Sequence, residues 1–240
     1  TARSGYAGQL SDAIATVIGM AIAAPSLFVN EGSTLQLSAS VVFDDVTTSP
    51  LAANEITWSV SSGPLTGIDA AGLVTAGIVY EDSAAVAQGD YQGFVEILGL
   101  TVLDSDPDNF GSYAADGVGD DWQVSYFGLS NQQAAPSFDA DGDGQSNAFE
   151  YTAGLIPTDA SSRFTIQIAP VSGQPTQQAI TFDPTISGRS YTVKRREFLD
   201  SGTWLPLAAS TTSDAGAERT VIDAGATATT QFYIVEIVKD

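Results

Sequence analysis

The most constraining feature of this sequence is an acidic loop, Asp-Ala-Asp-Gly-Asp-Gly-Gln-Ser-Asn-Ala-Phe-Glu, at residues 139–150. It matches the pattern D-x-[DN]-x-[DN]-G-x5-E, in which alternating side-chain oxygens surround a calcium ion and the glycine allows a sharp turn. Three aspartates within five residues would repel one another unless a cation neutralised them. The 139–150 loop is therefore predicted to bind Ca²⁺ through Asp139, Asp141, Asp143, the carbonyl of Gln145, Asn147 and a bidentate Glu150.

A second acidic stretch, the 116–123 loop, looks like the latter half of such a pattern. Asp116 stands at position 5 and Asp120 at position 9, but Gln123 replaces the terminal glutamate, and positions 1 and 3 carry no acid. Two interpretations fit these residues. One is a second calcium site at Asp116 and Asp120, and the other is a degenerate repeat whose neighbouring aromatic residues pack as core.

The composition excludes several functional classes. With 29 acidic and 8 basic residues, the net charge of −21 disfavours nucleic acids and anionic membrane surfaces as partners. The chain has no cysteine and no histidine, which removes disulfides, thiolate nucleophiles, the usual zinc sites and histidine-based catalysis. Only Lys194 and Lys239 could act as a general base for a serine or threonine nucleophile. We therefore expect no enzymatic activity.

The same composition bears on location. No run approaches the roughly 20 apolar residues that a membrane-spanning helix requires, so we expect no membrane insertion. An acidic β-rich chain without cysteine suits an exterior in which abundant calcium replaces disulfides as the stabilising cross-link. The expected location is extracellular or on the cell surface.

Charge and strand patterns divide the chain into parts. Residues 1–162 hold one base and 21 acids, a net −20, whereas residues 163–240 hold seven bases and eight acids, a net −1. Short runs rich in Val, Ile, Thr and Leu, separated by turn residues, are typical of β-sandwiches. We expect a mainly β fold in which two β-sandwich (Ig-like) domains are joined by a short calcium-binding loop-helix connector. Its parts are an N-terminal arm at 1–25, a sandwich at 26–103, the connector with two short helices at 104–162, and a sandwich at 163–240.

The N-terminal arm alternates large and small side chains. Read with a period of two, one face carries Ile14, Thr16, Ile18, Met20 and Ile22, and the other carries mostly alanine and glycine. An extended strand with one large face can fill a groove between two sheets. One hypothesis is that the arm inserts into the next subunit as an added strand, which would build a head-to-tail filament. The alternative is that it pairs within its own chain as an edge strand or forms a short helix.

Three stretches resemble known families. Residues 116–128 and 139–164 resemble the thrombospondin type 3-like calcium repeats of exported bacterial proteins, particularly those of verrucomicrobial type. Residues 56–60 and 68–76, a tryptophan strand followed by D-x-x-G-L-V-T-A, look like the bacterial Ig-like group 2 signature. Residues 163–240 are similar to the β-sandwich tail that often follows such repeats. The resemblance implies spacing, adhesion and surface display, and no particular reaction.

These observations lead to one principal functional expectation and two alternatives. The principal one is an extracellular structural protein, a calcium-stabilised surface or filament subunit that assembles with copies of itself through its N-terminal strand. The first alternative is a carbohydrate-binding or adhesive module in which Trp58, Trp122 or Trp204 contacts a glycan, although each lies in a pattern that favours core packing. The second is a spacer region of a larger exported protein.

Overall fold

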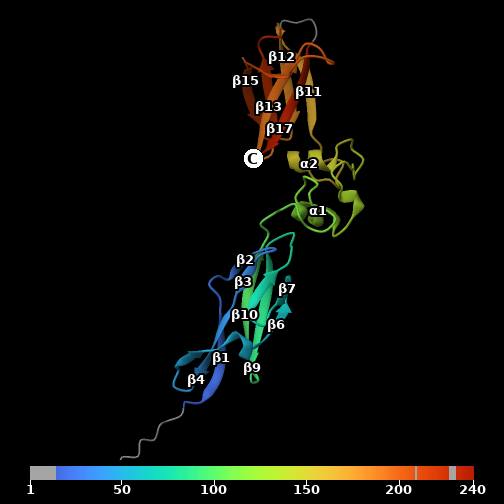
Figure 1. Ribbon diagram of the computed structural model, residues 1–240. Coiled ribbons are helices and arrows are strands. Elements are labelled where there is room, and N and C mark those ends of the chain that lie inside the picture. Colours follow the sequence, from blue (N-terminus) through green and yellow to red (C-terminus); the bar gives the residue numbers. More distant parts are fainter. Residues whose placement is uncertain (1–14, 209, 227–230) are drawn as a thin grey trace, which may run out of the picture. The chain divides into compact units, whose positions relative to one another are not determined.

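The computed structural model describes residues 15–208, 210–226 and 231–240. The fold is mainly β, as predicted, and the chain divides into two compact units, Thr1–Phe110 and Gly111–Asp240 (Figure 1). The boundary therefore follows residue 110 and does not coincide with the change in charge near Arg163. Most of the expected connector forms one unit with the C-terminal sandwich. Among the described residues, no helix is long and apolar enough to cross a membrane.

The first unit is built from three small sheets with the strand orders β2-β10-β9-β6, β1-β4-β5 and β3-β8-β7. All ladders are antiparallel except the one between β10 and β2. The elements are β1 (Val17–Ala23), β2 (Phe28–Asn30), β3 (Thr34–Gln36), β4 (Ser38–Phe43), β5 (Thr48–Pro50), η1 (Ala53–Glu55), β6 (Thr57–Ser62), β7 (Leu65–Ile68), β8 (Leu73–Ala76), β9 (Ser83–Tyr91) and β10 (Phe94–Leu103).

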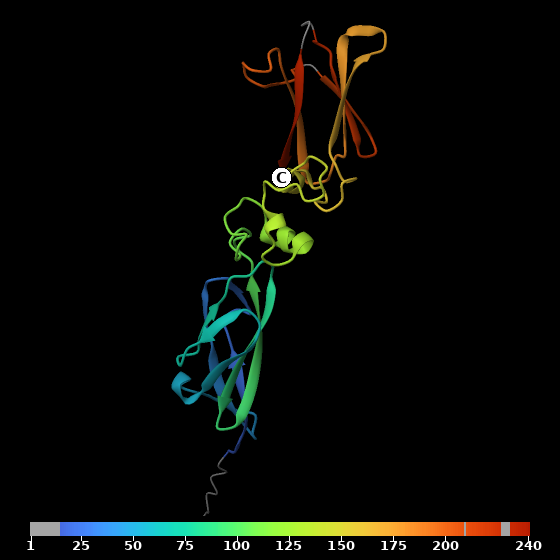
Figure 2. The ribbon, with the colours of Figure 1, turned by 90° about the vertical axis from the view of Figure 1, so that its right-hand side faces the viewer.

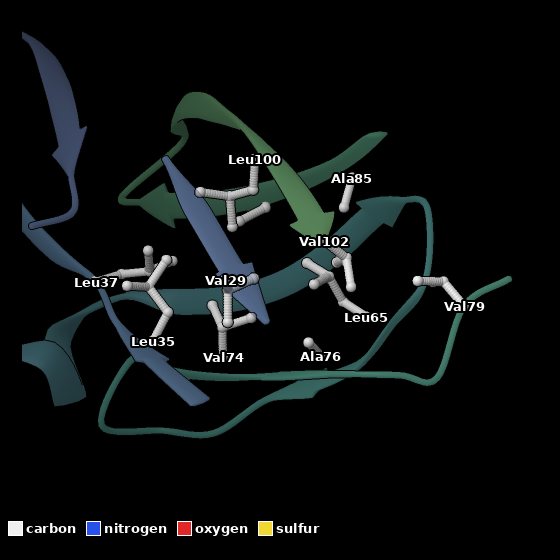
Figure 3. Close-up of a cluster of buried hydrophobic side chains, with 11 residues drawn as sticks. Val29, Leu35, Leu37, Leu65, Val74, Ala76, Val79, Ala85, Leu100 and Val102 are labelled. Carbon is white, nitrogen blue, oxygen red and sulfur yellow. The ribbon is translucent and has the colours of Figure 1, made fainter. Parts of the chain in front are cut away.

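The core of this unit follows from the two-residue period of its strands. In β10, Leu100 and Val102 point inward, and the paired strand β9 contributes Ala85 and Ala87. Figure 3 shows Leu100, Val102 and Ala85 converging with side chains from β2, β3, β7, β8 and the residues that follow β3 and β8, namely Val29, Leu35, Leu37, Leu65, Val74, Ala76 and Val79. The aliphatic runs that predicted a sandwich over residues 26–103 thus supply its interior.

A buried carboxylate closes one end of the first unit. Glu31 is 6% exposed and accepts hydrogen bonds from the backbone N–H groups of Val79 (3.0 Å), Ser105 (3.0 Å) and Asp106 (2.9 Å). Burial alone would raise the pKa of Glu31, but these donors and the Asn109 side chain bring it below its ordinary value. Because Glu31 holds the backbone just after β10, residues 104–110 belong to the first unit.

The N-terminal strand pairs within its own chain. β1 runs antiparallel to β4, from Val17 opposite Phe43 to Ala23 opposite Ser38. This arrangement matches the alternative in which the arm is an edge strand, and it makes residues 17–23 part of the first sandwich.

The large face of β1 divides into a buried and an exposed half. Met20 is buried with Ala39 and Ile56, and Ile22 packs beside it, whereas Thr16 and Ile18 are exposed. The space for these side chains comes from Gly89 of β9, where a Cβ atom would lie 3.2 Å from both Met20 Cε and Ile22 Cδ1. The strand is therefore an edge strand whose inner half packs Met20 and Ile22 against Gly89 of β9 in the same chain. Ile14 lies outside the described residues.

Truncating Met20 tests whether β1 is an integral part of the first unit. Met20→Ala is expected to lower the free energy of unfolding of this unit by about 2–5 kcal/mol, because it empties a buried site that cannot fully collapse. Ile18, 55% exposed on the same strand, provides the matched control, and Ile18→Ala should change stability by less than about 0.5 kcal/mol. Urea unfolding measures both. Equal effects of the two substitutions would show that β1 is not docked in this way.

The second unit combines a helical segment with a sandwich, whose strands lie in two layers (Figure 2). The sheet orders are β11-β12-β16-β15 and β14-β13-β17, and all ladders are antiparallel. The elements are α1 (Asp120–Phe127), η2 (Gln132–Ala134), α2 (Asn147–Ala153), β11 (Thr165–Val171), β12 (Gln174–Asp183), β13 (Arg189–Arg196), β14 (Leu205–Pro206), β15 (Ser210–Ala215), β16 (Glu218–Asp223) and β17 (Phe232–Lys239).

Helix α2 shares the core of this sandwich. Ala153 and Leu155, at and just after its end, are buried with Phe164, Ile180, Phe182, Val193 and Val221. The Arg189 side chain of β13 donates to the carbonyls of Tyr151 and Thr152, two of the acceptors that a helix leaves free at its C-terminus. The helix and the sandwich therefore stabilise one another, which explains why the charge boundary at Arg163 is not a structural one.

Candidate metal centre

The 139–150 loop brings its three aspartates together. One carboxylate oxygen from each of Asp139, Asp141 and Asp143 lies within 4.8 Å of the other two, and among the described residues this is the one acidic group of three with such spacing. Backbone donors shape the loop, because Asp139 accepts from Gly142 N (2.8 Å) and Gly144 N (2.9 Å). Gly144 has φ +93°, a conformation that side chains disfavour, which is the physical reason for glycine at this position.

Each of the other two aspartates uses one oxygen to fold the loop and keeps the other free. Asp141 Oδ1 accepts from Asp143 N (3.1 Å), and Asp143 Oδ1 accepts from Gln145 N (2.7 Å). The second oxygen of each, Oδ2, is buried and has no hydrogen-bond donor. Buried acceptors without donors are costly in a protein interior. The two oxygens are thus available for a cation.

Glu150 lacks hydrogen-bond donors at both of its carboxylate oxygens. It lies in the first turn of α2, it is 0% exposed, and neither of its carboxylate oxygens has a donor. Burial, followed by the charges of Asp141, Asp143 and Asp139, raises the pKa of Glu150 to about 7. A bound divalent cation would offset the cost of burying the ionised carboxylate and neutralise its repulsion with the aspartates. The donor set is hard and all oxygen, which is the chemistry that Ca²⁺ prefers.

Asn147 presents an oxygen in a fixed direction. It is 0% exposed, and its Nδ2 donates to the carbonyls of Gln133 (2.7 Å) and Ala135 (2.9 Å). These two bonds assign the amide nitrogen, and they leave Oδ1 buried without a donor. The oxygen at loop position 9, which the sequence pattern predicts as a ligand, is therefore held in a fixed direction.

Gln145 has a second role that the sequence pattern did not reveal. Its Oε1 accepts from Phe164 N (3.0 Å) and its Nε2 donates to Phe164 O (2.9 Å). The side chain therefore ties the 139–150 loop to the residue that precedes β11. The calcium pattern constrains only the carbonyl at this position, so nothing in the spacing signals the side-chain contact.

The 116–123 loop, the predicted second calcium site, is arranged differently. Asp116 Oδ1 accepts from Val118 N (3.0 Å), which repeats the bond between Asp143 and Gln145 in the first loop. Asp116 Oδ2, however, accepts from Gln123 Nε2 (2.8 Å), and the same nitrogen donates to Ala134 O (3.0 Å). A side-chain amide thus holds the oxygen whose counterpart in Asp143 has no donor. Asp120 is fully buried in this loop.

The three tryptophans considered for glycan contact are all half-buried. Trp58 packs against the core of the first unit, and Trp122 makes edge-to-face contacts with Tyr126, Phe127 and Tyr151. The Arg196 guanidinium lies 4.3 Å from the centre of the Trp204 ring. These contacts use the ring surfaces within the protein.

No protein-family model matches the chain, and no curated protein matches it at a significant level of similarity. The function is therefore inferred from the residues and contacts described above.

Proposed function

We propose that this chain is an extracellular structural protein whose second unit is held in shape by one calcium ion in the 139–150 loop. The observation that carries this proposal is the fully buried Glu150, whose two donor-free oxygens share a loop with three aspartates. The ion would be bound by Asp139, Asp141, Asp143, the Gln145 carbonyl, Asn147 and Glu150. It would neutralise charge that the fold otherwise concentrates without compensation.

The effect of the ion would be to fasten the helical segment to the sandwich. Glu150 belongs to α2, whose end contributes Ala153 and Leu155 to the sandwich core. On the other side of the loop, the Gln145 side chain pairs with the backbone of Phe164. Calcium would thus hold two connections to the sandwich at once, which suits a permanent structural role better than a switch.

The broader role that we propose is that of a surface or filament subunit. The absence of histidine and cysteine from the sequence argues against common catalysis, and the acidic composition suits a calcium-rich exterior. The resemblance to bacterial Ig-like and thrombospondin type 3-like segments supports the same role. Since β1 is used within its own sandwich, assembly would need a contact other than exchange of residues 17–23.

Calorimetric titration with calcium tests the metal site directly. We expect one ion per chain, and Asp141→Asn should weaken its binding at least about tenfold, because the substitution removes one of the charged ligands. Asp200→Asn is the matched control, since Asp200 is exposed and distant in sequence from the loop, and its titration should equal that of the unsubstituted protein. An Asp141→Asn protein with unchanged calcium affinity would refute the site.

A second titration tests the role of Gln123. Gln123→Glu replaces the amide that holds Asp116 with a carboxylate, so the 116–123 loop would gain the missing ligand at its last position. We expect the number of bound ions to rise from one to two at millimolar calcium. Gln132→Glu adds the same charge at an exposed position nearby and should leave the number at one. One ion in both variants would mean that the acids missing at positions 1 and 3 are indispensable.

A further inference from the structure

A groove of about 560 Å³ opens on the second unit beside the 139–150 loop. The end of the loop forms one wall and apolar side chains form the rest, with the lining Gly144, Gln145, Ser146, Phe149, Phe164, Ile166 and Val235. Ile166 belongs to β11 and Val235 to β17, which are edge strands of the two sheets. The groove therefore lies where the two layers of the sandwich meet at one side.

Strand β11 shows that this side of the sandwich is open. Ile166 and Ile168 stand opposite Phe182 and Ile180, which are almost completely buried, so all four side chains face the layer between the sheets. Ile166 and Ile168 are nevertheless 42% and 50% exposed. In the part of the chain that the structure describes, β11 forms a ladder only with β12. Its other edge and its core-facing side chains are thus both accessible to an added strand.

We propose that this groove receives residues 1–14 of a second copy of the chain as an added β-strand. The proposal rests on the proposed function and names the contact through which such a subunit would assemble. Tyr6, Leu10 and Ile14 are spaced four residues apart, which places them on one face of an extended strand about 13 Å from one to the next. Main-chain hydrogen bonds to β11 would supply affinity, and these side chains would enter the apolar groove.

Charge favours this pairing over other contacts between copies. Residues 15–162 carry 20 acids and no base, so any contact that involves them on both sides meets repulsion. Residues 1–14 carry one base and one acid, a net charge of zero, and residues 163–240 carry a net −1. The donor segment and the acceptor strands therefore lie in the two parts of the chain that escape the acidic excess.

A donor segment from another copy builds an open head-to-tail chain, because the donor segment and the acceptor groove are different parts of the molecule.

The groove also links assembly to calcium. Residues 144–146, which form one wall, belong to the loop that the ion would hold, and Gln145 ties this wall to Phe164 on the groove floor. Removal of calcium would leave the loop acids unneutralised and release the wall. Binding of the donor segment is therefore expected to require calcium.

A peptide experiment tests the groove. A chain that begins at Ala15 keeps every described residue, and a fluorescent peptide of residues 1–14 serves as the probe in an anisotropy titration with millimolar calcium. We expect saturable binding that weakens at least about tenfold in Ile166→Lys and remains unchanged in Leu205→Lys. Leu205, 60% exposed on β14, is the matched control. Absence of binding, or equal loss in both variants, would overturn the proposal.

Two further measurements separate this proposal from the proposed function. Light scattering and electron microscopy of the full chain in calcium should show head-to-tail oligomers that are lost in the chain beginning at Ala15, and a full chain that stays monomeric would overturn the groove assignment alone. Peptide binding that persists in a chelator would overturn the dependence on calcium. The calcium titration without peptide reports on the metal site independently of either result.

Discussion

Removal of calcium by a chelator is expected to lower the melting temperature of the second unit by on the order of 10 °C. A ligand that binds only the folded state stabilises it by about 2.7 kcal/mol when its concentration is 100 times its dissociation constant. For a unit of this size, each kcal/mol corresponds to a few degrees. The described part of the first unit contains no comparable acidic cluster, so its transition should not move. Calorimetric scans with calcium and with chelator measure both transitions.

Glu150→Gln provides the decisive variant for this result. The substitution removes the bidentate carboxylate, so the calcium-dependent rise in melting temperature should disappear. In the chelated state the variant should be no less stable than the unsubstituted protein, because it also removes a buried charge that has no donor. Glu218→Gln, the same change at an exposed position in β16, should keep the full calcium response. A Glu150→Gln protein that is still stabilised by calcium would contradict the proposed ligand set.

The clustering of the three loop aspartates could be predicted because these residues are local in sequence. The three aspartates that the structure groups, Asp139, Asp141 and Asp143, lie within five consecutive residues, and Gly144 at the turn has the left-handed conformation that the pattern demands. Asn147 illustrates the limit of that prediction. The pattern predicts it as a ligand, but the bonds to Gln133 and Ala135 that fix its orientation involve a segment that the pattern does not include.

The sequence predicted the large face of the N-terminal strand, but it did not predict which element that face packs against. Its period of two identified the large face that contains Met20 and Ile22. The partner depended on the gap above Gly89, about 70 residues later in the sequence, and on the pairing with β4. A glycine in a strand signals close approach of another element, but it does not say which element approaches.

The change in charge and the division into compact units follow different residues. The basic residues begin at Arg163, and this change in composition suggested a new domain. The contacts that define the units are instead Glu31 with residues 105 and 106 in the first, and α2 with the sandwich core in the second. Surface charge is determined by the contacts of a protein with solvent and partners, whereas unit boundaries are determined by the packing of buried side chains. Buried side chains bring together residues that are distant in sequence, so their packing is harder to predict.

Without calcium, the second unit is expected to lose stability as the pH rises from 5 to 8. Burial and the neighbouring aspartates raise the pKa of Glu150 from its ordinary value of 4.5 to about 7 in the folded chain. Between these two values the folded state holds a proton that the unfolded state releases, so each increase in pH favours unfolding. Below about pH 4.5 the carboxyl group is neutral in both states, and above about pH 7 the loss is complete, at roughly 3 kcal/mol.

Calcium should abolish this dependence, because a ligated Glu150 stays ionised and compensated throughout the same range. Urea unfolding at pH 5, 6, 7 and 8, with chelator and with calcium, gives the two profiles, and Glu150→Gln in chelator should be flat. Glu31 does not interfere, since its pKa is lowered and its contribution is lost only as the pH falls below about 4.5. A chelated protein whose stability rises with pH between 5 and 8 would show that Glu150 is compensated by something other than a cation. Binding of calcium near pH 6 should in turn release a proton, which titrations in buffers of different ionisation enthalpy would detect.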